Sequence, residues 1–273
     1  MKNEKITICI AGVTGWVGRN IVKYISESSE YQLVSAVARN SSGLEVGELL
    51  GIKDLHAMIF KDVKDALRSK PDVLIDYTSP LIVKSNVMEA LKRGVNVVIG
   101  TSGLSDEDFQ EIEEEAVKNS AGVVAAGNYS IASALMLNFS VVASRYMKSW
   151  EIIDYASERK TDVPSGTTFE LVHRISRESR PKIEVPDNLV TGIKETRGAE
   201  LNGMKVHSLR LPGFTIGAEV IFGDLDQTLS IRYNGGNDAT PYVYGTMIAI
   251  KKAMNTKGLI RGMDKIMGFE VPS

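Results

Sequence analysis

The chain has 273 residues, enough for one large domain or for two of ordinary size. Its formal net charge of -2 excludes a general nucleic-acid or membrane-surface binder, because no basic excess exists to neutralise phosphates. The single cysteine, Cys9, cannot form an internal disulfide, and no apolar stretch is long enough to span a bilayer. Since residues 1–5 lead straight into a strand-like segment and no signal peptide is expected, we expect a cytoplasmic protein.

The first half of the sequence alternates short apolar segments with amphipathic ones. Strands are predicted by β-rich runs at residues 5–12, 31–38, 72–78, 95–101 and 122–127. Helical spacing is found at residues 18–28, 81–94 and 105–120. Continuous apolar strands separated by amphipathic helices indicate a doubly wound, Rossmann-type parallel α/β sheet with helices on both faces.

The second half has a different pattern. Strands are predicted at residues 150–157, 204–211, 216–223 and 227–233, and helices after Pro164 and at residues 239–255. Strands in such quick succession indicate a smaller α+β domain with a mainly antiparallel sheet. We therefore predict a dinucleotide-binding domain from residues 1–127 with 239–273, and a substrate-binding and oligomerisation domain at residues 128–238.

A glycine loop lies between the first predicted strand and the first predicted helix. Gly12, Gly15 and Gly18 form a variant of the dinucleotide fingerprint. The first glycine permits a tight turn, the second lets the backbone approach a pyrophosphate, and the third allows close packing of helix on strand. The alternative is a turn with a purely structural role, but the strand before it and the helix after it favour dinucleotide binding.

The end of the second predicted strand bears on the choice of dinucleotide. NAD-binding proteins usually carry an acid there, which accepts hydrogen bonds from the ribose 2′-hydroxyl. This sequence has Ala38 and Arg39 instead, and a guanidinium suits a 2′-phosphate. Arg39 taken alone is explained nearly as well as a solvated loop arginine. The missing acid is the stronger argument, so we expect NADPH to be preferred, with NADH possible.

Small polar loops follow the later predicted strands of the first half, at residues 76–80, 100–103 and 127–130. In open α/β sheets, ligands bind outside the carboxyl ends of the strands, where these loops lie. The expected cofactor-binding residues are Gly12, Thr14, Gly15, Trp16, Val17, Gly18, Arg39, Thr78, Gly100, Thr101, Ser102, Gly127, Asn128 and Tyr129.

A second candidate anion site lies in residues 158–168 (ERKTDVPSGTT). Lys160 stands five residues before Ser165, where a helix is expected to begin. An ammonium and a helix N-terminus close together form a charge-assisted site for an anion. The alternative is a surface lysine beside a simple N-cap serine.

These motifs together resemble the dihydrodipicolinate reductase family, NAD(P)H-dependent enzymes of diaminopimelate and lysine biosynthesis. The resemblance covers nearly the whole chain. It is carried by the glycine loop, IDYTSP (75–80), VVIGTSG (97–103), NYS (128–130), the K-x-D-x-PSGT element (160–167), VHSLRLPG (206–213), EVIFG (219–223) and QTLSIR (227–232). It implies a tetramer built by the sheet of the smaller domain, and hydride transfer to a cyclic unsaturated imine dicarboxylate.

The resemblance also assigns roles to the second anion site. It implies that Lys160, Ser165, Gly166 and Thr167 hold one substrate carboxylate. The family carries a histidine pair just before that lysine, one histidine being the proposed proton donor, whereas this sequence has Ala156 and Ser157. Neither is a competent acid near neutral pH.

A second departure concerns substrate binding. The family places a substrate-binding arginine near the position of Asp238, and an acid there would repel a second carboxylate. We expect Lys160 or a bound water to supply the proton. Tyr155, Glu158 and His207 remain alternative donors, because strand alternation alone does not decide which way they point.

No cluster of His, Cys and Asp in the sequence has metal-ligand spacing, so no metal is expected. The leading hypothesis is a reductase of the dihydrodipicolinate type that acts on a small carboxylate substrate. The second is a relative with the same fold that reduces another imine or oxidises an amino acid. The third is a catalytically weak nucleotide-binding protein, which the second anion site disfavours.

Overall fold

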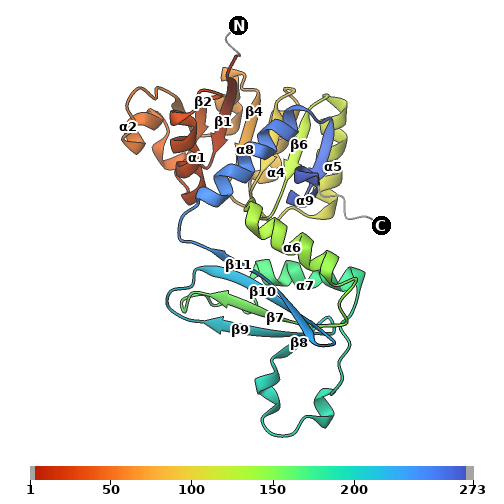
Figure 1. The fold of residues 1–273 in the computed structure, drawn as a ribbon. Coiled ribbons are helices and arrows are strands. Elements are labelled where there is room, and N and C mark those ends of the chain that lie inside the picture. Colours follow the sequence, from red (N-terminus) through yellow and green to blue (C-terminus); the bar gives the residue numbers. More distant parts are fainter. Residues whose placement is uncertain (1–3, 269–273) are drawn as a thin grey trace. The chain divides into compact units, whose positions relative to one another are not determined.

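The structure, a computed structural model, describes residues 4–268 (Figure 1). The described chain divides into two compact units. One contains the chain up to Ile131 together with the segment from Ala239 onward, and the other runs from Ala132 to Asp238. The functional roles assigned above to the two parts of the chain remain predictions.

The first unit is built on a parallel sheet with the strand order β12-β6-β5-β4-β1-β2-β3. Its strands are β1 (Ile6–Ala11), β2 (Tyr31–Val37), β3 (Met58–Phe60), β4 (Val73–Asp76), β5 (Asn96–Ile99), β6 (Gly122–Ala125) and β12 (Gly258–Arg261). The chain leaves β1 toward β2 and β3, then crosses to β4 on the other side. This reversal between β1 and β4 is the topological switch point of a doubly wound sheet.

Helices cover both faces of this sheet (Figure 1). They are α1 (Trp16–Glu27), η1 (Arg39–Ser41), α2 (Val46–Leu50), α3 (Val63–Ala66), η2 (Leu67–Ser69), α4 (Val83–Leu91), α5 (Asp106–Lys118), α8 (Thr240–Met254) and α9 (Met263–Met267). α1 and α8 pack together on one side, and α3, α4 and α5 pack in series on the other. The expected Rossmann-type fold is therefore confirmed.

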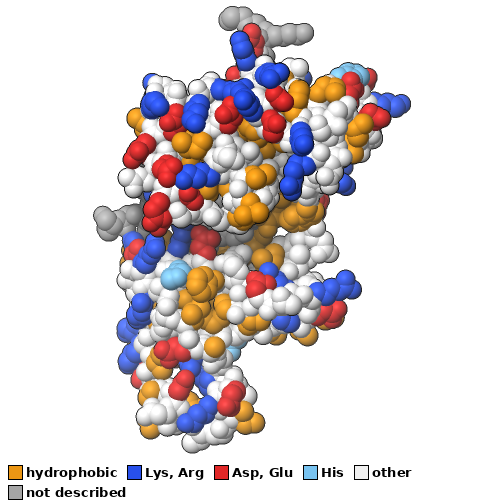
Figure 2. All heavy atoms as spheres, turned by 180° about the vertical axis from the view of Figure 1, so that it is seen from behind, with side chains coloured by type: hydrophobic (Ala, Val, Ile, Leu, Met, Phe, Trp, Pro, Cys, Tyr) orange, Lys and Arg blue, Asp and Glu red, His pale blue; other side chains and the backbone are white. Residues whose placement is uncertain are grey.

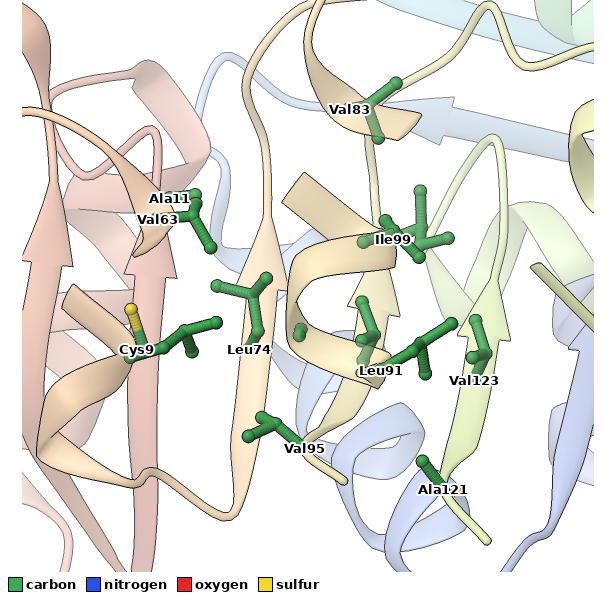
Figure 3. Close-up of a cluster of buried hydrophobic side chains, with 14 of the residues drawn as sticks. Cys9, Ala11, Val63, Leu74, Val83, Leu91, Val95, Ile99, Ala121 and Val123 are labelled. Carbon is green, nitrogen blue, oxygen red and sulfur yellow. The ribbon is translucent and has the colours of Figure 1, made fainter. Parts of the chain in front are cut away.

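One core of the first unit lies between the sheet and the α3–α4–α5 layer (Figure 3). Strand residues such as Leu74, Ile99 and Val123 pack there against helix residues such as Leu91. Cys9 belongs to this core and is fully buried, and its burial raises the pKa of the thiol to about 12. Cys9 is therefore a small buried hydrophobe, as its apolar surroundings in the sequence indicate.

The second unit is an α+β domain whose sheet has the order β11-β10-β7-β9-β8. Its elements are α6 (Ile131–Ala143), β7 (Ser149–Ala156), α7 (Gly166–Glu178), η3 (Asp187–Leu189), η4 (Lys194–Arg197), β8 (Ala199–Leu201), β9 (Met204–Arg210), β10 (Ile216–Asp224) and β11 (Gln227–Gly235). Neighbouring strands are antiparallel except β7 and β9, which are parallel. The mainly antiparallel sheet is thus confirmed.

α6 and α7 lie on one face of this second sheet (Figure 1). Leu137 of α6 and Leu171 of α7 belong to one buried cluster with Trp150, Ile152 and other sheet residues. Because side chains alternate along a strand, the residues beside Ile152 in β7 point to the opposite face. This alternation decides which residues of β7 can reach the start of α7.

β3, β8 and β12 were not predicted, because strands of three or four residues carry too little periodicity to be recognised. No helix of the described residues is long and apolar enough to cross a membrane. On the face seen in Figure 2, basic and acidic side chains are interspersed over both units, in agreement with the small net charge.

Candidate functional site

The glycine loop lies at the switch point of the first sheet. Gly12 adopts φ +87°, and a Cβ built there would collide with the carbonyl oxygen of Tyr77, just beyond β4. Its N–H donates to the carbonyl of Val37 at the end of β2, over 3.0 Å. The loop therefore lies against the ends of both strands that flank β1, where doubly wound sheets bind dinucleotides.

The start of α1 is open to an external anion. Its N-cap is Gly15, which provides no side-chain cap, and the first turn has no acidic residue. Gly15 is exposed, and an added Cβ would lie 3.2 Å from the carbonyl oxygen of Gly12. Gly18 is buried, and an added Cβ would collide with that same oxygen. Gly12 and Gly18 are thus required by the fold, while Gly15 is the glycine that faces solvent.

Two further residues predicted to bind the cofactor lie beside this loop. Trp16, the first residue of α1, is 53% exposed and meets Tyr242 of α8 edge-on, with ring centroids 5.5 Å apart. Arg39 is exposed and begins η1, directly after β2 and Ala38. Since β2 is the parallel neighbour of β1, Arg39 lies at the same sheet edge as the glycine loop.

A buried aspartate ties together the loops after β4 and β5. Asp76, at the end of β4, is 0% exposed. It accepts hydrogen bonds from the Thr78 hydroxyl (2.7 Å), the Thr101 hydroxyl (2.7 Å) and the Asn86 amide (2.8 Å). The backbone N–H of Thr78 also donates to it, over 3.0 Å. Two of the predicted cofactor-binding residues are therefore held side by side through a residue that the sequence did not single out.

The remaining loop residues have unequal access to a ligand. Ser102 and Gly127 are exposed, and Gly100 lies against the Tyr77 ring, where a Cβ would collide. Tyr129 is a core residue whose hydroxyl donates to the Ile99 carbonyl over 2.8 Å, and burial raises its pKa. Its side chain faces the interior, so any contact with a cofactor falls to its backbone.

The first unit thus fits a dinucleotide. The glycine loop turns tightly at the switch point, the start of α1 offers N–H groups at an exposed glycine, and Asp76 holds the two neighbouring loops. Backbone N–H groups at a helix start bind phosphates well, because the helix dipole favours negative charge there.

In the second unit, α7 begins at the predicted place but with a buried cap. Ser165 is the N-cap, fully buried, and its hydroxyl oxygen accepts a hydrogen bond from the Thr168 N–H over 3.4 Å. The same hydroxyl donates to Asp154 over 2.6 Å. Gly166 is exposed and Thr167 is partly exposed. The groups at this helix start that can meet a ligand are therefore those of Gly166 and Thr167, while Ser165 is committed to the protein.

Asp154 of β7 is the centre of this arrangement. It is 0% exposed and lies 2.7 Å from the Arg210 guanidinium of β9, whose side chain is 15% exposed. It also accepts hydrogen bonds from the Ser165 N–H (3.0 Å) and the Thr168 hydroxyl (2.8 Å). Burial alone would raise the pKa of Asp154, but the Ser165 and Arg210 hydrogen bonds outweigh it and lower that pKa.

Lys160 lies in the loop between β7 and α7, with its side chain 31% exposed. Its ammonium is 2.8 Å from the carboxylate of Asp162. That contact lowers the pKa of Asp162, chiefly through the hydrogen bond from Lys160. Arg210 also donates to the backbone carbonyl of Asp162, over 2.7 Å. The ammonium and the helix start expected from the sequence are thus connected through Arg210 and Asp154.

Two alternative proton donors are placed on the other face of the sheet. Tyr155 follows Asp154 in β7, so its side chain points away from α7, and its hydroxyl donates to Glu219 over 2.7 Å. His207 pairs in register with Ile153, on that same far face, and contacts Glu151 at 2.7 Å. Both are engaged in hydrogen bonds away from the start of α7.

The positions where the sequence departs from the resemblance differ in their surroundings. Ala156 is fully buried at the end of β7. Ser157 is partly exposed, and its hydroxyl accepts a hydrogen bond from the Arg159 N–H over 3.4 Å. Glu158, the remaining alternative donor, is exposed on the same loop as Lys160, and Asp238 is exposed at the end of the second unit.

Asp76, Asp154 and Arg210 are the site residues that the sequence reasoning missed. Asp154 had a detectable signal, because it is a charged residue between the buried apolar residues Ile152 and Ala156 on one face of a strand. Arg210 had none of this kind, since Ser208 and Pro212 on either side of it are exposed. Across residues 4–268, no group of three or more His, Cys, Asp or Glu side chains could hold a metal ion.

Comparison with known proteins identifies the family. A model described as "Dihydrodipicolinate reductase, N-terminus" matches residues 6–129, and one described as "Dihydrodipicolinate reductase, C-terminus" matches residues 132–267. The chain belongs to the dihydrodipicolinate reductase family. The resemblance read from the sequence motifs is therefore confirmed.

Relatives in this family match along their whole length. The chain is 35% identical to a 4-hydroxy-tetrahydrodipicolinate reductase of Desulfitobacterium hafniense, covering 97% of this chain and 99% of the relative. It is 33% identical to one of Bacillus cereus, with the same coverage of both chains.

Solved structures agree with this. A dipicolinate-bound dihydrodipicolinate reductase from Paenisporosarcina sp. TG-14 superposes with a TM-score of 0.86 at 27% identity, over 96% of this chain and 100% of that one. An amine dehydrogenase from Mycobacterium smegmatis, at 15% identity and a TM-score of 0.64 over 95% of both chains, shares the fold alone.

Proposed function

We propose that this protein is an NAD(P)H-dependent 4-hydroxy-tetrahydrodipicolinate reductase, which transfers hydride to a cyclic unsaturated imine carboxylate in diaminopimelate and lysine biosynthesis. The observation that carries the proposal is the match of both family models over nearly the whole chain. The position of Lys160 in the loop that leads to the start of α7 supports it. The dipicolinate-bound relative supports a small cyclic dicarboxylate as the ligand.

The first unit binds the cofactor, whose reduced nicotinamide supplies the hydride when bound. The start of α1 receives the pyrophosphate, because its N–H groups are uncapped and Gly15 leaves room for close approach. Arg39 receives a 2′-phosphate, so NADPH is preferred over NADH. Asp76 holds Thr78 and Thr101 in place, and these line the cofactor site next to β4 and β5.

The second unit binds the substrate. The N–H groups of Gly166 and Thr167 and the ammonium of Lys160 hold one carboxylate of the substrate, since each is a donor at the same short segment. Lys160 is also the proton source, directly or through a bound water, because Ala156 and Ser157 replace the histidines of the family. Asp162 keeps the Lys160 side chain in position through its ion pair.

A second candidate function is the reduction of a different imine by the same machinery. Ala156 is wholly buried and uncharged where the family carries a histidine, and Asp238 replaces the expected arginine. The first change removes a group that would donate a proton, and the second removes a group that would bind a second carboxylate. A monocarboxylate imine would tolerate these changes better than a dicarboxylate.

The deciding experiment measures NADPH oxidation by the purified protein with freshly prepared 4-hydroxy-tetrahydrodipicolinate, beside a panel of cyclic imines with one carboxylate. The proposal expects the dicarboxylate to give the highest kcat/KM. A monocarboxylate imine with a higher kcat/KM would support the second candidate. Absence of turnover with every imine, despite tight NADPH binding, would favour a nucleotide-binding protein without catalysis.

Ser157→His sharpens the choice, since Ser157 is partly exposed and has room that the buried Ala156 lacks. A dihydrodipicolinate-type reductase with a weakened donor should become faster on the dicarboxylate when the histidine is restored. An enzyme whose pocket serves another imine should gain nothing on that substrate.

We also propose that the protein is cytoplasmic and assembles into a homotetramer through the second unit. Support comes from the family resemblance and from exposed leucines on that sheet, among them Leu209 and Leu229. Light scattering coupled to size-exclusion chromatography measures the assembled mass. A monomeric mass at micromolar concentration would contradict the tetramer.

A further inference from the structure

The buried pair of Asp154 and Arg210 joins two segments that are separate in the chain. One is the start of α7 at Ser165, and the other is the loop that contains Lys160 and Asp162. Neither member of the pair is free to meet a ligand, because Asp154 is fully buried, both terminal nitrogens of Arg210 donate to protein acceptors, and its Nε is buried. Their contacts nevertheless converge on the groups that form the second anion site.

Asp154 determines the geometry of the helix start. Its carboxylate accepts the Ser165 N–H, the Ser165 hydroxyl and the Thr168 hydroxyl at 3.0, 2.6 and 2.8 Å. These bonds hold the N-cap in the extended conformation that starts α7. The next two N–H groups, those of Gly166 and Thr167, belong to the first helical turn and point along its axis toward the N-terminal side. Their direction is therefore set by Asp154.

Arg210 determines the position of the loop. One of its terminal nitrogens donates both to Asp154 and to the carbonyl oxygen of Asp162, each over 2.7 Å. Asp162 in turn holds the Lys160 ammonium at 2.8 Å. One nitrogen atom thus fixes the distance between the helix start and the segment that presents the ammonium.

A purely structural role would not explain why this ion pair is buried. Replacing a buried ion pair with apolar side chains is often neutral or stabilising, because desolvation of the two charges cancels much of their attraction. The pair is better explained by what it positions, since a charged donor site works only when its parts are held to within a fraction of an ångström.

We propose that Asp154 and Arg210 are positioning residues that preassemble the carboxylate site, holding the N–H groups of Gly166 and Thr167 at a fixed distance from the Lys160 ammonium. This inference rests on the proposed function of that site as the binder of a substrate carboxylate. It adds two residues to the site, neither of which touches the substrate.

The test replaces Arg210 with methionine, which keeps the aliphatic stem and removes the shared donor. Dipicolinate is the probe, and its dissociation constant is measured by calorimetry on the NADPH-saturated full-length protein. The matched control is Arg145→Met, because Arg145 binds Glu178 at the opposite end of α7, at 2.9 Å. Both variants remove an ion pair that anchors α7, but only one of these pairs lies at the carboxylate site.

Arg210→Met is expected to raise the dipicolinate dissociation constant and the substrate KM by roughly 10- to 100-fold, as positioning losses of this kind do. NADPH affinity should not change. Arg145→Met should lower the melting temperature and leave the dipicolinate dissociation constant at the wild-type value. If both variants lose stability and neither loses dipicolinate affinity, the pair is merely structural and the proposal is overturned.

Arg210→Lys decides the matter if the methionine variant does not fold. Its ammonium is one bond shorter and keeps the charge beside Asp154, but it gives up the bond to the Asp162 carbonyl. Losing one such bond should weaken dipicolinate binding about two- to tenfold. An unchanged dissociation constant in this variant would overturn the proposal.

The wild-type protein distinguishes a failure of the proposed function from a failure of the positioning role alone. If it neither binds dipicolinate nor reduces 4-hydroxy-tetrahydrodipicolinate, the proposed function itself fails. If it does both while the Arg210 variants bind dipicolinate as it does, only the positioning role fails.

Discussion

α1 and α7 begin in different ways, although each has the features of a helix start that binds an anion. α1 has a glycine as its N-cap, with no side-chain hydrogen bond to its first turn. α7 has a buried serine as its N-cap, whose hydroxyl donates a hydrogen bond to Asp154. The start of α1 depends on a residue without a side chain, and the start of α7 depends on the buried carboxylate of Asp154.

α5 shows what a helix start looks like when the protein itself satisfies it. Ser105 and Asp108 form a reciprocal capping box, and Asp106 and Glu107 add negative charge to the same turn. α1 and α7 have no acidic residue in their first turns. Because carboxylates stabilise a helix N-terminus, α5 satisfies its own start, whereas the first turns of α1 and α7 contain no carboxylate that would repel an external anion.

This difference implies that a larger side chain at the start of α1 should block cofactor binding there. The loss of a charge near the start of α7 should weaken substrate binding. The largest effect is expected at Lys160. Lys160→Met keeps the length of the side chain but removes the proposed acid and the charge proposed to hold the carboxylate. General acid catalysis alone is typically worth about 10²–10⁴-fold, so hydride transfer measured in single-turnover experiments should fall at least that far.

NADPH binding provides the control for Lys160→Met, because the proposed cofactor site belongs to the other unit. Its dissociation constant, measured by fluorescence titration, should match that of the wild type. A variant that turned over its best substrate at the wild-type rate would remove Lys160 from the site altogether.

The effect of a larger side chain is tested at the N-cap of α1. Gly15→Val should lower NADPH affinity beyond detection with the circular dichroism spectrum unchanged, because the new side chain intrudes where the pyrophosphate must approach. Gly166→Ala is the matching change at α7, where a Cβ meets no other atom within 4 Å. It should leave NADPH affinity intact. Retained NADPH binding in Gly15→Val would show that the loop is only a turn.

A smaller effect is expected at Arg39, the residue proposed to bind the 2′-phosphate. A charged hydrogen bond of this kind is worth roughly 1.5–3 kcal/mol. Arg39→Ala should therefore weaken NADPH by about 10- to 150-fold and leave NADH nearly unchanged. The comparison is made by titrating both cofactors against both proteins. Equal losses for the two would place Arg39 away from the 2′-phosphate.

The smallest effect is a pH dependence in the second unit. The pKa of Asp154 is lowered in the folded protein, so its stabilising contribution is full above the unfolded value of about 3.9 and is lost as pH falls through the lower folded value. Each unit of depression contributes about 1.4 kcal/mol. Urea unfolding between pH 7 and pH 3 should therefore show a loss that Asp154→Asn lacks.

Tryptophan fluorescence can follow this unit separately. The chain has two tryptophans, Trp16 in α1 and the buried Trp150 in β7. Trp16→Phe leaves Trp150 as the reporter of the second unit. The same pH slope in the presence and absence of Asp154 would assign the effect to other carboxylates.

Much of the first unit could be predicted from the sequence because its signals are local. A glycine loop between an apolar run and an amphipathic run is visible within about twenty residues. Gly12 and Gly18 proved to be required by close backbone contacts, as that motif implies. The start of α7 was visible for the same reason, since Ser165 caps a helix that begins at the next residue.

The connections between segments could not be predicted in the same way. Asp154 and Arg210 are 56 residues apart in the chain and meet because β7 and β9 are parallel neighbours in the sheet. No local pattern encodes that pairing. The placement of Tyr155 and His207 on the far face also needed the sheet, because only the packing of α7 shows which face of β7 it covers.

The return of the chain to its first sheet has a consequence for protein synthesis. β12 pairs with β6, and α8 packs on β5 and β6, so the first unit needs residues that emerge from the ribosome after the whole second unit. At a synthesis rate of 5–20 residues per second, the interval between residues 131 and 268 is about 7 to 27 seconds. The second unit is continuous in sequence and can fold during that time. Until β12 has been synthesised, the nascent first unit exposes an unpaired strand edge at β6. Such an edge can pair with another newly made chain, so we expect chaperones to bind this surface during synthesis.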